Sequence, residues 1–202
     1  MKIICIGRNY AEHIEELGNE RPTDPIIFMK PDTALIRNND PFYYPDFSSD
    51  IHHEVELLVK IKKEGKSIPE EFASSYFDEI GLGIDFTARD WQTKAKEKGH
   101  PWEIAKGFNG SAPVSDFISK AGYDISNLNF RLIKNGEDVQ TANTSLMLWN
   151  INEIISYVSK FILLKTGDII FTGTPKGVGP VQIGDRLEGY LEDKKMFDFE
   201  VK

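Results

Sequence analysis

The chain has 202 residues, of which 40% are hydrophobic and 28% charged, and its formal net charge is −8 at pH 7. This length and composition are typical of an ordinary globular protein with one sizeable core, so we expect residues 1–202 to form a single domain. The negative charge repels polyanions and argues against nucleic-acid binding, and the sequence contains no apolar run long enough to predict a membrane span.

The cysteine content and the amino terminus bear on the cellular compartment. The single cysteine, Cys5, excludes an internal disulfide, and we expect it to pack as a small apolar residue, which is compatible with a reducing compartment. The apolar segment at the amino terminus stops at Gly7 and is too short for the core of a signal peptide. The sequence therefore predicts a cytoplasmic protein.

Hydrophobic periodicity and turn residues predict the elements along the chain. We expect a strand over residues 2–6, a helix over residues 10–17 ended by Gly18, and strands over 25–29, 54–61 and 80–87. Helical character follows over 87–97, and Asn135-Gly136 predicts a tight hairpin between 130–134 and 138–141. An amphipathic helix is expected over 150–161, and strands over 168–172, 186–191 and 196–201.

Many strands with about three helices, in no regular βαβ alternation, favour a β-rich α+β fold. The glycine pair Gly81-x-Gly83 does not fit a dinucleotide fingerprint, and the spacing around Gly173 does not fit a phosphate-binding loop. We therefore expect no nucleotide or organic cofactor.

Three carboxylates suggest a metal site. Glu54 and Glu56 are two residues apart in a predicted strand, so their side chains would project to the same face, and Asp85 comes from a second apolar segment. An all-oxygen ligand set favours Mg²⁺, Mn²⁺ or Ca²⁺ over zinc or copper. The spacing alone favours a polar strand face wetted by solvent, because Glu-x-Glu is common on half-exposed strands.

A histidine and a carboxylate share one face of the first predicted helix. His13 and Glu16 are three residues apart, so the carboxylate could orient the imidazole as a general base, although spacing alone favours a solvated helix surface. Arg8 and Tyr10, just before the helix, could form a turn around an anion, or a simple connection.

Further polar residues could approach the same site. Arg89 and Gln92 follow Asp85 closely, but a structural ion pair between Arg89 and Asp90 is the favoured role for that arginine. Lys106 is flanked by apolar and small residues, which favours a partly buried cation near the metal over a snorkelling surface residue.

A glycine- and proline-rich loop follows the strand predicted at 168–172. Its backbone N–H groups, from Gly173 onward, and the Thr174 hydroxyl could form a rigid array suited to a carboxylate. Taken alone, the loop would be interpreted as an ordinary β-turn connection.

Together these segments resemble the fumarylacetoacetate hydrolase family, most closely its short acylpyruvase and oxaloacetate decarboxylase branch. The resemblance covers nearly the whole chain and is carried by the segments 7–13, 53–56, 85–90, 105–106 and 172–179. Larger members of the family have an additional amino-terminal domain. Because this chain begins directly at the catalytic domain, we expect a substrate other than fumarylacetoacetate.

The resemblance implies a mixed β-sheet roll with a few peripheral helices, usually dimeric, that binds Mg²⁺ or Mn²⁺. It assigns the metal ligands to Glu54, Glu56 and Asp85. It implies a catalytic base dyad on a lid helix within residues 1–20, further catalytic contacts to the substrate, and substrate-binding residues around them. The positions that match are His13 and Glu16 for the dyad, Lys106 and Gln92 for the contacts, and Arg8, Tyr10, Arg89, Gly173 and Thr174 for substrate binding.

The implied substrate is a small 2-oxo carboxylate. Hydrolysis of a C–C bond in an acylpyruvate and decarboxylation of oxaloacetate would share a pyruvate enolate, so we expect a metal-dependent hydrolase with decarboxylase activity. An isomerase or tautomerase of a related acid, of the 2-hydroxyhepta-2,4-diene-1,7-dioate or oxaloacetate type, would use the same enolate and remains the alternative. A non-catalytic metal-binding protein would be expected to lack some of His13, Glu16 and Lys106, and all three are present.

Overall fold

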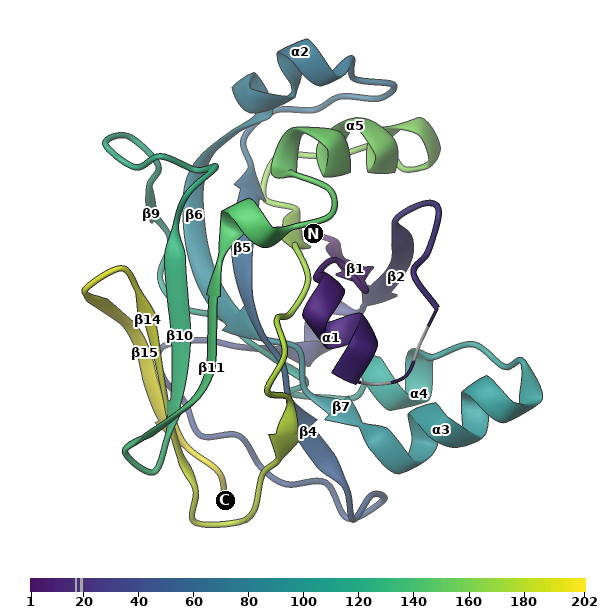
Figure 1. Ribbon diagram of the computed structural model, residues 1–202, viewed down its shortest axis with the longest axis vertical. Coiled ribbons are helices and arrows are strands. Elements are labelled where there is room, and N and C mark those ends of the chain that lie inside the picture. Colours follow the sequence, from purple (N-terminus) through teal and green to yellow (C-terminus); the bar gives the residue numbers. More distant parts are fainter. Residues whose placement is uncertain (17, 19) are drawn as a thin grey trace.

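The computed structural model describes residues 1–16, 18 and 20–202 (Figure 1). Its largest sheet has six strands in the order β2-β1-β12-β5-β6-β9. β1 and β12 are parallel and the other pairs in this sheet are antiparallel. The strands are β1 (Ile3–Gly7), β2 (Ile26–Lys30), β5 (Val55–Ile61), β6 (Phe77–Ile84), β9 (Ile118–Ser119) and β12 (Ile169–Phe171).

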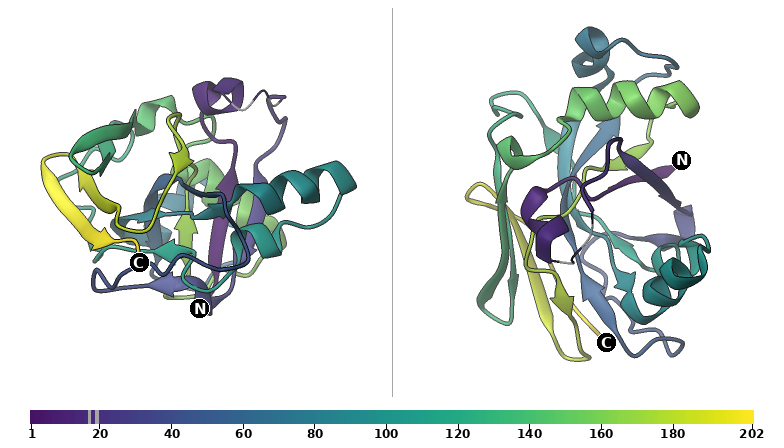
Figure 2. Two further views of the ribbon diagram at one scale, coloured as in Figure 1. Left: turned by 90° about the horizontal axis from the view of Figure 1, so that it is seen from below. Right: turned by 45° about the vertical axis from the view of Figure 1, so that its right-hand side comes forward.

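A second, antiparallel sheet has four strands in the order β11-β10-β14-β15 and forms a separate layer beside the first (Figures 1 and 2). Its strands are β10 (Asn129–Lys134), β11 (Glu137–Asn143), β14 (Arg186–Leu191) and β15 (Lys194–Glu200). A three-stranded sheet joins β13 (Gly179–Pro180), β4 (Ile51–His53) and β7 (Thr87–Ala88), and β3 (Leu35–Ile36) pairs with β8 (Ala112–Pro113).

The helices are short and lie at the periphery. α1 (Ala11–Glu16) lies beside β1, α3 (Arg89–Lys98) and α4 (Glu103–Lys106) lie together, and α2 (Glu70–Ala73) packs against α5 (Ile151–Phe161) (Figure 1). Three 3₁₀ turns complete the described elements: η1 (Asp32–Ala34), η2 (Ser74–Tyr76) and η3 (Thr144–Leu146). Within the described ranges, no helix is both long and apolar enough to cross a membrane.

The main core lies between the two large sheets. Leu57 and Leu82 of the six-stranded sheet belong to the same buried cluster as Phe130 and Leu187 of the four-stranded sheet. A smaller cluster, which includes Cys5, Leu58 and Phe171, lies on the other face of the six-stranded sheet. The central strands are therefore covered on both faces, which accounts for their nearly continuous apolar sequences.

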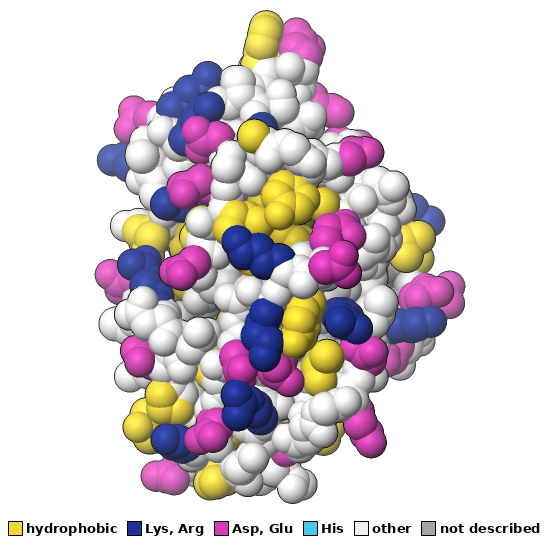
Figure 3. All heavy atoms as spheres, turned by 90° about the vertical axis from the view of Figure 1, so that its left-hand side faces the viewer, with side chains coloured by type: hydrophobic (Ala, Val, Ile, Leu, Met, Phe, Trp, Pro, Cys, Tyr) yellow, Lys and Arg dark blue, Asp and Glu magenta, His cyan; other side chains and the backbone are white. Residues whose placement is uncertain are grey.

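The face formed by the outer surface of the four-stranded sheet and β9 carries acidic and basic side chains in alternation, with small apolar groups between them (Figure 3). On this surface the Tyr190 ring lies between Arg131, 4.8 Å from its centroid, and Lys195, at 5.7 Å. Such a mixed surface gives this face no uniform basic potential.

The predicted β-rich α+β fold is confirmed, and so are its strongest local signals. Asn135 and Gly136 have φ values of 54° and 87°, as the tight hairpin requires. The predicted helix over 150–161 forms α5, where Asn150 and Glu153 make a capping box.

Several predicted boundaries differ. α1 begins at Ala11 because Tyr10 forms a β-bridge with Met147, and the predicted helix end at residue 17 lies outside the described residues. The strand expected over 80–87 ends at Ile84, since Asp85 and Phe86 leave the sheet before β7. The strands β3, β4, β7, β8, β9 and β13 were not predicted, because two or three residues are too few to show a period.

Candidate active site

Three carboxylates meet where β5 begins and β6 ends. Glu54 occupies the single position between β4 and β5, Glu56 is the second residue of β5, and Asp85 directly follows β6. β5 and β6 are antiparallel with Val55 opposite Ile84, so the residues before one strand and after the other are neighbours, and the Asp85 N–H donates to the Glu54 carbonyl over 2.8 Å. One oxygen from each carboxylate lies within 4.8 Å of the other two.

The interpretation of Glu-x-Glu as a solvated strand face is wrong. Glu54 is 4% exposed, Glu56 2% and Asp85 0%. The reason is that β5 is buried on both sides: Leu57 packs into the main core and Leu58 into the smaller cluster. A carboxylate on such a strand must be compensated by nearby cations or hydrogen-bond donors.

Lys106, on α4, contacts two of the three carboxylates. Its Nζ donates to Glu54 Oε2 over 2.8 Å, to Asp85 Oδ2 over 2.6 Å and to the Thr87 hydroxyl over 2.6 Å. These three acceptors use all three ammonium protons. Although burial favours the neutral amine, Asp85 and Glu54 raise the pKa of Lys106, so it remains a cation.

Lys30, at the end of β2, is a buried cation beneath the site. Its Nζ lies 2.8 Å from Asp85 Oδ1 and donates to the carbonyl oxygens of Phe86, Lys106 and Ser111 and to the Ser111 hydroxyl. The contact with Asp85 is an ion contact without hydrogen-bond geometry, and Oδ1 accepts no hydrogen bond within the described part of the chain. Because the Lys30 side chain is fully buried, its ammonium group is available to Asp85 and the neighbouring oxygens and not to solvent.

The two glutamates of the site differ electrostatically. Burial tends to raise the pKa of Glu54, but Lys106 and Arg89 outweigh it and hold that pKa well below its usual range. Burial and the neighbouring Asp85 raise the pKa of Glu56 well above its usual range, and its Oε2 accepts the Gly173 N–H over 2.7 Å. Glu56 is therefore the carboxylate in greatest need of an additional positive charge.

The residues present fit a divalent cation. Three buried carboxylates converge, Asp85 Oδ1 has no hydrogen-bond donor, and Glu56 lacks a cationic side-chain partner within hydrogen-bonding distance among the described residues. An all-oxygen donor set of this kind suits Mg²⁺ or Mn²⁺.

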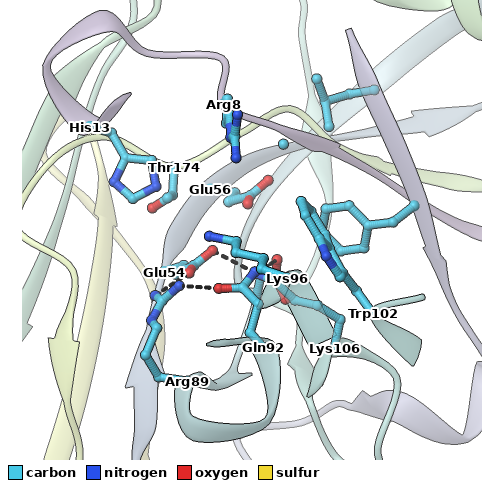
Figure 4. Close-up of a pocket in the computed structure, with 14 residues that line it drawn as sticks. Arg8, His13, Glu54, Glu56, Arg89, Gln92, Lys96, Trp102, Lys106 and Thr174 are labelled. Carbon is cyan, nitrogen blue, oxygen red and sulfur yellow. Dashed lines mark hydrogen bonds and ion pairs between the residues drawn. The ribbon is translucent and has the colours of Figure 1, made fainter. Parts of the chain in front are cut away.

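Arg89 is part of the site, and the expected ion pair with Asp90 is wrong. Its Nη2 donates to Glu54 Oε1 over 2.6 Å and its Nη1 donates to Gln92 Oε1 over 2.6 Å (Figure 4). Asp90 instead accepts from Ser48. As the first residue of α3, Arg89 turns toward the strand end that carries Glu54.

His13 and Glu16 form a pair on α1, and His13 lines the same cavity. His13 is 5% exposed, and its Nδ1 lies 3.3 Å from Glu16 Oε2. Burial lowers the pKa of His13, partly offset by Glu54 and Glu16, so the imidazole is neutral at neutral pH. With Nδ1–H donated to Glu16, Nε2 carries the free lone pair.

The loop after β12 contributes Thr174 to the cavity, but its donors already have partners. The Gly173 N–H binds Glu56, and the Thr174 hydroxyl donates to the Val55 carbonyl over 2.9 Å while accepting from Gln140 Nε2 over 2.9 Å. The loop is thus fixed to β5 on one side and β11 on the other.

Arg8 lines the cavity with φ of 59°, and its Nη1 lies 3.4 Å from the Glu20 carbonyl. Among the predicted site residues, Glu16 and Gly173 do not line the cavity and reach it through their contacts with His13 and Glu56. Tyr10 does not line the cavity either. Its ring packs edge-to-face on Phe130, with centroids 6.4 Å apart, and its hydroxyl has no hydrogen-bond partner among residues 1–16, 18 and 20–202. Tyr10 therefore lies in the core.

Five cavity residues and one supporting cation were not among the predicted site residues. The five that line the cavity are Ile6, Gly7, Phe28, Lys96 and Trp102, and Lys30 lies below it. Lys96 lies in the charge-rich run 94–98, which is typical of a solvated helix face. Lys30 carried a detectable signal, since it is a lysine that directly ends an apolar strand and precedes a proline.

Comparison with known proteins gives consistent results. The family model described as fumarylacetoacetate (FAA) hydrolase C-terminal matches residues 2–201. A mitochondrial oxaloacetate tautomerase of Mus musculus is 44% identical over 201 residues, covering 99% of this chain and 91% of the relative. An oxaloacetate tautomerase of Escherichia coli K12 is 44% identical over 188 residues, covering 92% of this chain and 86% of the relative.

Solved structures agree in fold. The crystal structure of fumarylpyruvate hydrolase from Pseudomonas aeruginosa in complex with Mn²⁺ and pyruvate has a TM-score of 0.94 and 34% identity, covering 100% of this chain and 89% of that one. The crystal structure of a fumarylacetoacetate hydrolase family protein from Yersinia pestis CO92 has a TM-score of 0.96 and 41% identity, covering 100% of this chain and 93% of that one.

Proposed function

The chain belongs to the fumarylacetoacetate hydrolase family of enzymes, and we propose that it is a divalent-metal-dependent enzyme that interconverts the enol and keto forms of oxaloacetate. The observation that carries this proposal is the placement of a neutral, buried His13 in the same cavity as the three carboxylates. A base opposite a cation site is what proton transfer next to a 2-oxo group requires.

Glu54, Glu56 and Asp85 would hold the metal, with Mg²⁺ or Mn²⁺ as the expected ions. When bound there, the ion supplies Lewis-acid stabilisation of negative charge on the carboxylate and 2-oxo oxygens of the substrate. Lys106, Arg89 and Lys30 contact Glu54 and Asp85 from the protein side, and the Gly173 N–H holds Glu56.

His13 would move the proton. In the enol-to-keto direction, the proton of the C2 hydroxyl is removed and a proton is added at C3; in reverse, Nε2 takes the C3 proton. Glu16 accepts from Nδ1, which fixes the tautomer with Nε2 as the base and stabilises the imidazolium that forms.

Gln92 would donate a hydrogen bond to the negatively charged substrate. Arg89 donates a hydrogen bond to Gln92 Oε1. This orients the Gln92 amide so that Nε2 and its two protons point away from Arg89. Lys106 has all three protons committed to the protein, so its contribution is to hold Glu54 and Asp85.

The sequence relatives favour oxaloacetate as the substrate. Relatives named oxaloacetate tautomerase match 99% and 92% of the chain at 44% identity.

A second candidate is hydrolysis of the C–C bond in acylpyruvates, with oxaloacetate decarboxylation as a side activity. It is supported by the His13–Glu16 pair, which would equally activate a water molecule, and by the 34% identical fumarylpyruvate hydrolase structure. The carbon–carbon cleavage would release a carboxylate and the enolate of pyruvate.

Three assays on the purified protein separate these activities, each with Mg²⁺, Mn²⁺ or EDTA. Loss of the ultraviolet absorbance of enol-oxaloacetate without pyruvate formation reports tautomerisation. Pyruvate formed from oxaloacetate reports decarboxylation, and pyruvate formed from acetylpyruvate reports hydrolysis. Metal-dependent tautomerisation faster than the other two is expected. Metal-dependent hydrolysis alone would establish the second candidate, and inactivity in all three would contradict both.

A further inference from the structure

A row of side chains on α3 faces the cavity beyond the carboxylates. Arg89, Gln92 and Lys96 are spaced at i, i+3 and i+7, which places them on one face of the helix, and all three line the cavity (Figure 4). Lys94, on the same helix, lies instead over the Trp91 ring, 4.9 Å from its centroid. The helix thus directs one of its lysines into the site and another elsewhere.

Two of these side chains have donors that the protein does not use. Arg89 is committed to Glu54 and to Gln92 Oε1. Gln92 is 5% exposed, and its Nε2 donates no hydrogen bond within the described residues. Lys96 likewise has no hydrogen bond or ion pair in the described part of the chain, and its closest aromatic neighbour is the Trp102 ring, 5.8 Å from Nζ.

The charges around Lys96 are unbalanced. Lys30, Lys106 and Arg89 already contact Glu54 and Asp85, and Lys96 is an additional cation in the same cavity, which Arg8 also lines. Lys96 is an exposed residue, but partial burial, followed by Arg8 and Arg89, lowers the pKa of its amine, and Glu54 opposes this effect. An anion placed here would relieve the repulsion between these cations.

We propose that Lys96 and the Gln92 amide form a second anion subsite, which binds the distal carboxylate of a dicarboxylic 2-oxo acid. The inference rests on the proposed function, because it assumes that the first carboxylate and the 2-oxo group of the substrate lie at the metal ion that Glu54, Glu56 and Asp85 would hold. The subsite makes Lys96 a specificity-determining residue that selects dicarboxylates over 2-oxo acids with an uncharged end. Arg89 is a positioning residue, since it orients the Gln92 amide.

The test compares two substrates that differ only at the distal end: oxaloacetate and its C4 monomethyl ester. Enol-to-keto conversion of both is measured with Mn²⁺ for wild type, Lys96→Met, Lys96→Arg and the control Lys94→Met. Lys94 is on the same helix but does not line the cavity. Thermal unfolding of each variant verifies that it is folded.

For wild type we expect kcat/KM to be about 10- to 100-fold higher for oxaloacetate than for the ester, which is the contribution of one hydrogen bond to a charged group. Lys96→Met should reduce this preference to about threefold or less, mainly through KM for oxaloacetate. Lys96→Arg should restore most of it, and Lys94→Met should leave it unchanged. Because the subsite is open to solvent, the wild-type preference should also shrink at high salt.

The two possible failures are distinguishable. If wild type converts both compounds but Lys96→Met lowers both rates equally, or changes neither, the subsite is wrong while the proposed function stands. If wild type converts neither compound with any metal, the proposed function is contradicted and the subsite with it.

Discussion

The carboxylate of Glu16 accepts the backbone N–H of Gly177 over 2.9 Å, and so connects α1 to the loop that follows β12. The other oxygen of the same carboxylate contacts His13. A second, exposed contact joins the same two segments, between Lys176 Nζ and Glu12 Oε2 at 3.0 Å. Glu16 therefore both orients the base and helps to hold α1 against this loop.

Replacing Glu16 should change the pH profile. Glu16 raises the pKa of His13 through its hydrogen bond and its charge, against the lowering effect of burial. Glu16→Gln removes the charge, so the pKa of His13 should fall further, and the acidic limb of the kcat/KM profile should move to lower pH than in wild type. The plateau rate should also fall, by about 10- to 100-fold, because the imidazolium formed in the reaction loses its counter-charge.

The amide of the same variant has one oxygen, so it can still accept the Gly177 N–H only with its NH₂ group turned toward His13, whereas Glu16→Ala loses both contacts. Glu16→Ala should therefore also raise KM. An unchanged acidic limb in Glu16→Gln would show that Glu16 does not set the basicity of His13.

His13 and Glu56 should differ in which reactions they support. His13→Ala should lower tautomerisation and acylpyruvate hydrolysis by about 10²- to 10⁴-fold, because both need a base. Loss of CO₂ from oxaloacetate needs no attacking water, so decarboxylation should fall by less than tenfold. Glu56→Ala should abolish all three reactions. Equal losses in His13→Ala would contradict this division of roles.

Metal binding should be measurable without any substrate. At a concentration about 100 times its dissociation constant, a ligand that binds only the folded state stabilises it by about 2.7 kcal/mol. Mn²⁺ should therefore raise the unfolding temperature of wild type relative to EDTA, and Asp85→Asn should show little or no increase. Asp78→Asn, which changes an exposed carboxylate 3.3 Å from Lys62, is the matched control. An equal increase in Asp85→Asn would mean that the ion binds elsewhere.

Gly173 should tolerate no side chain. Its φ is +106°, and an added Cβ would lie 2.6 Å from Asn9 Cβ. Asn9 cannot move away easily, because its Nδ2 donates to the Thr172 carbonyl over 2.7 Å and to the Trp149 carbonyl over 3.0 Å. Gly173→Ala should therefore reduce the free energy of unfolding in urea by about 2–4 kcal/mol, from steric overlap and backbone strain together.

Gly184 provides the control for that substitution. Its φ is +96°, but an added Cβ would meet nothing within 4 Å. Gly184→Ala should cost about 1 kcal/mol, the strain alone. Similar losses at both positions would show that the overlap with Asn9 is relieved by a small movement.

The sequence predicted the residues whose chemistry is visible in short motifs, such as Glu54, Glu56 and His13, and the hairpin at Asn135-Gly136. It could not show that Arg89 turns to Glu54 instead of Asp90, because that contact joins residues 35 apart in sequence. Nor could it separate Lys96 from Lys94, since only the axial orientation of α3 decides which lysine faces the cavity. Such choices depend on tertiary packing, which local patterns do not encode.

Lys30 is a buried cation that was not predicted, and its removal should reduce the stability of the protein strongly. It is 2% exposed, lies 2.8 Å from Asp85 Oδ1, and donates to oxygens of Phe86, Lys106 and Ser111. Lys30→Met would leave Asp85 partly uncompensated and would remove the donor to the Phe86 carbonyl, whereas the Lys106 and Ser111 carbonyls keep the Ser111 hydroxyl and the Phe86 N–H as donors. The free energy of unfolding should therefore fall by about 3–5 kcal/mol, mainly through the buried charge on Asp85. Lys60→Met is the control. It removes a Lys–Glu ion pair, 2.7 Å between Lys60 and Glu79, at a position that is more than a third exposed, and it should lower the free energy of unfolding by about 1 kcal/mol or less.

A double variant tests whether Lys30 acts through Asp85. Because the penalty in Lys30→Met arises from the charge on Asp85, adding Asp85→Asn should recover part of the lost free energy of unfolding, measured in urea with EDTA present. A double variant that is less stable by the full sum of the two single losses would show that Lys30 acts through its carbonyl contacts and not through Asp85.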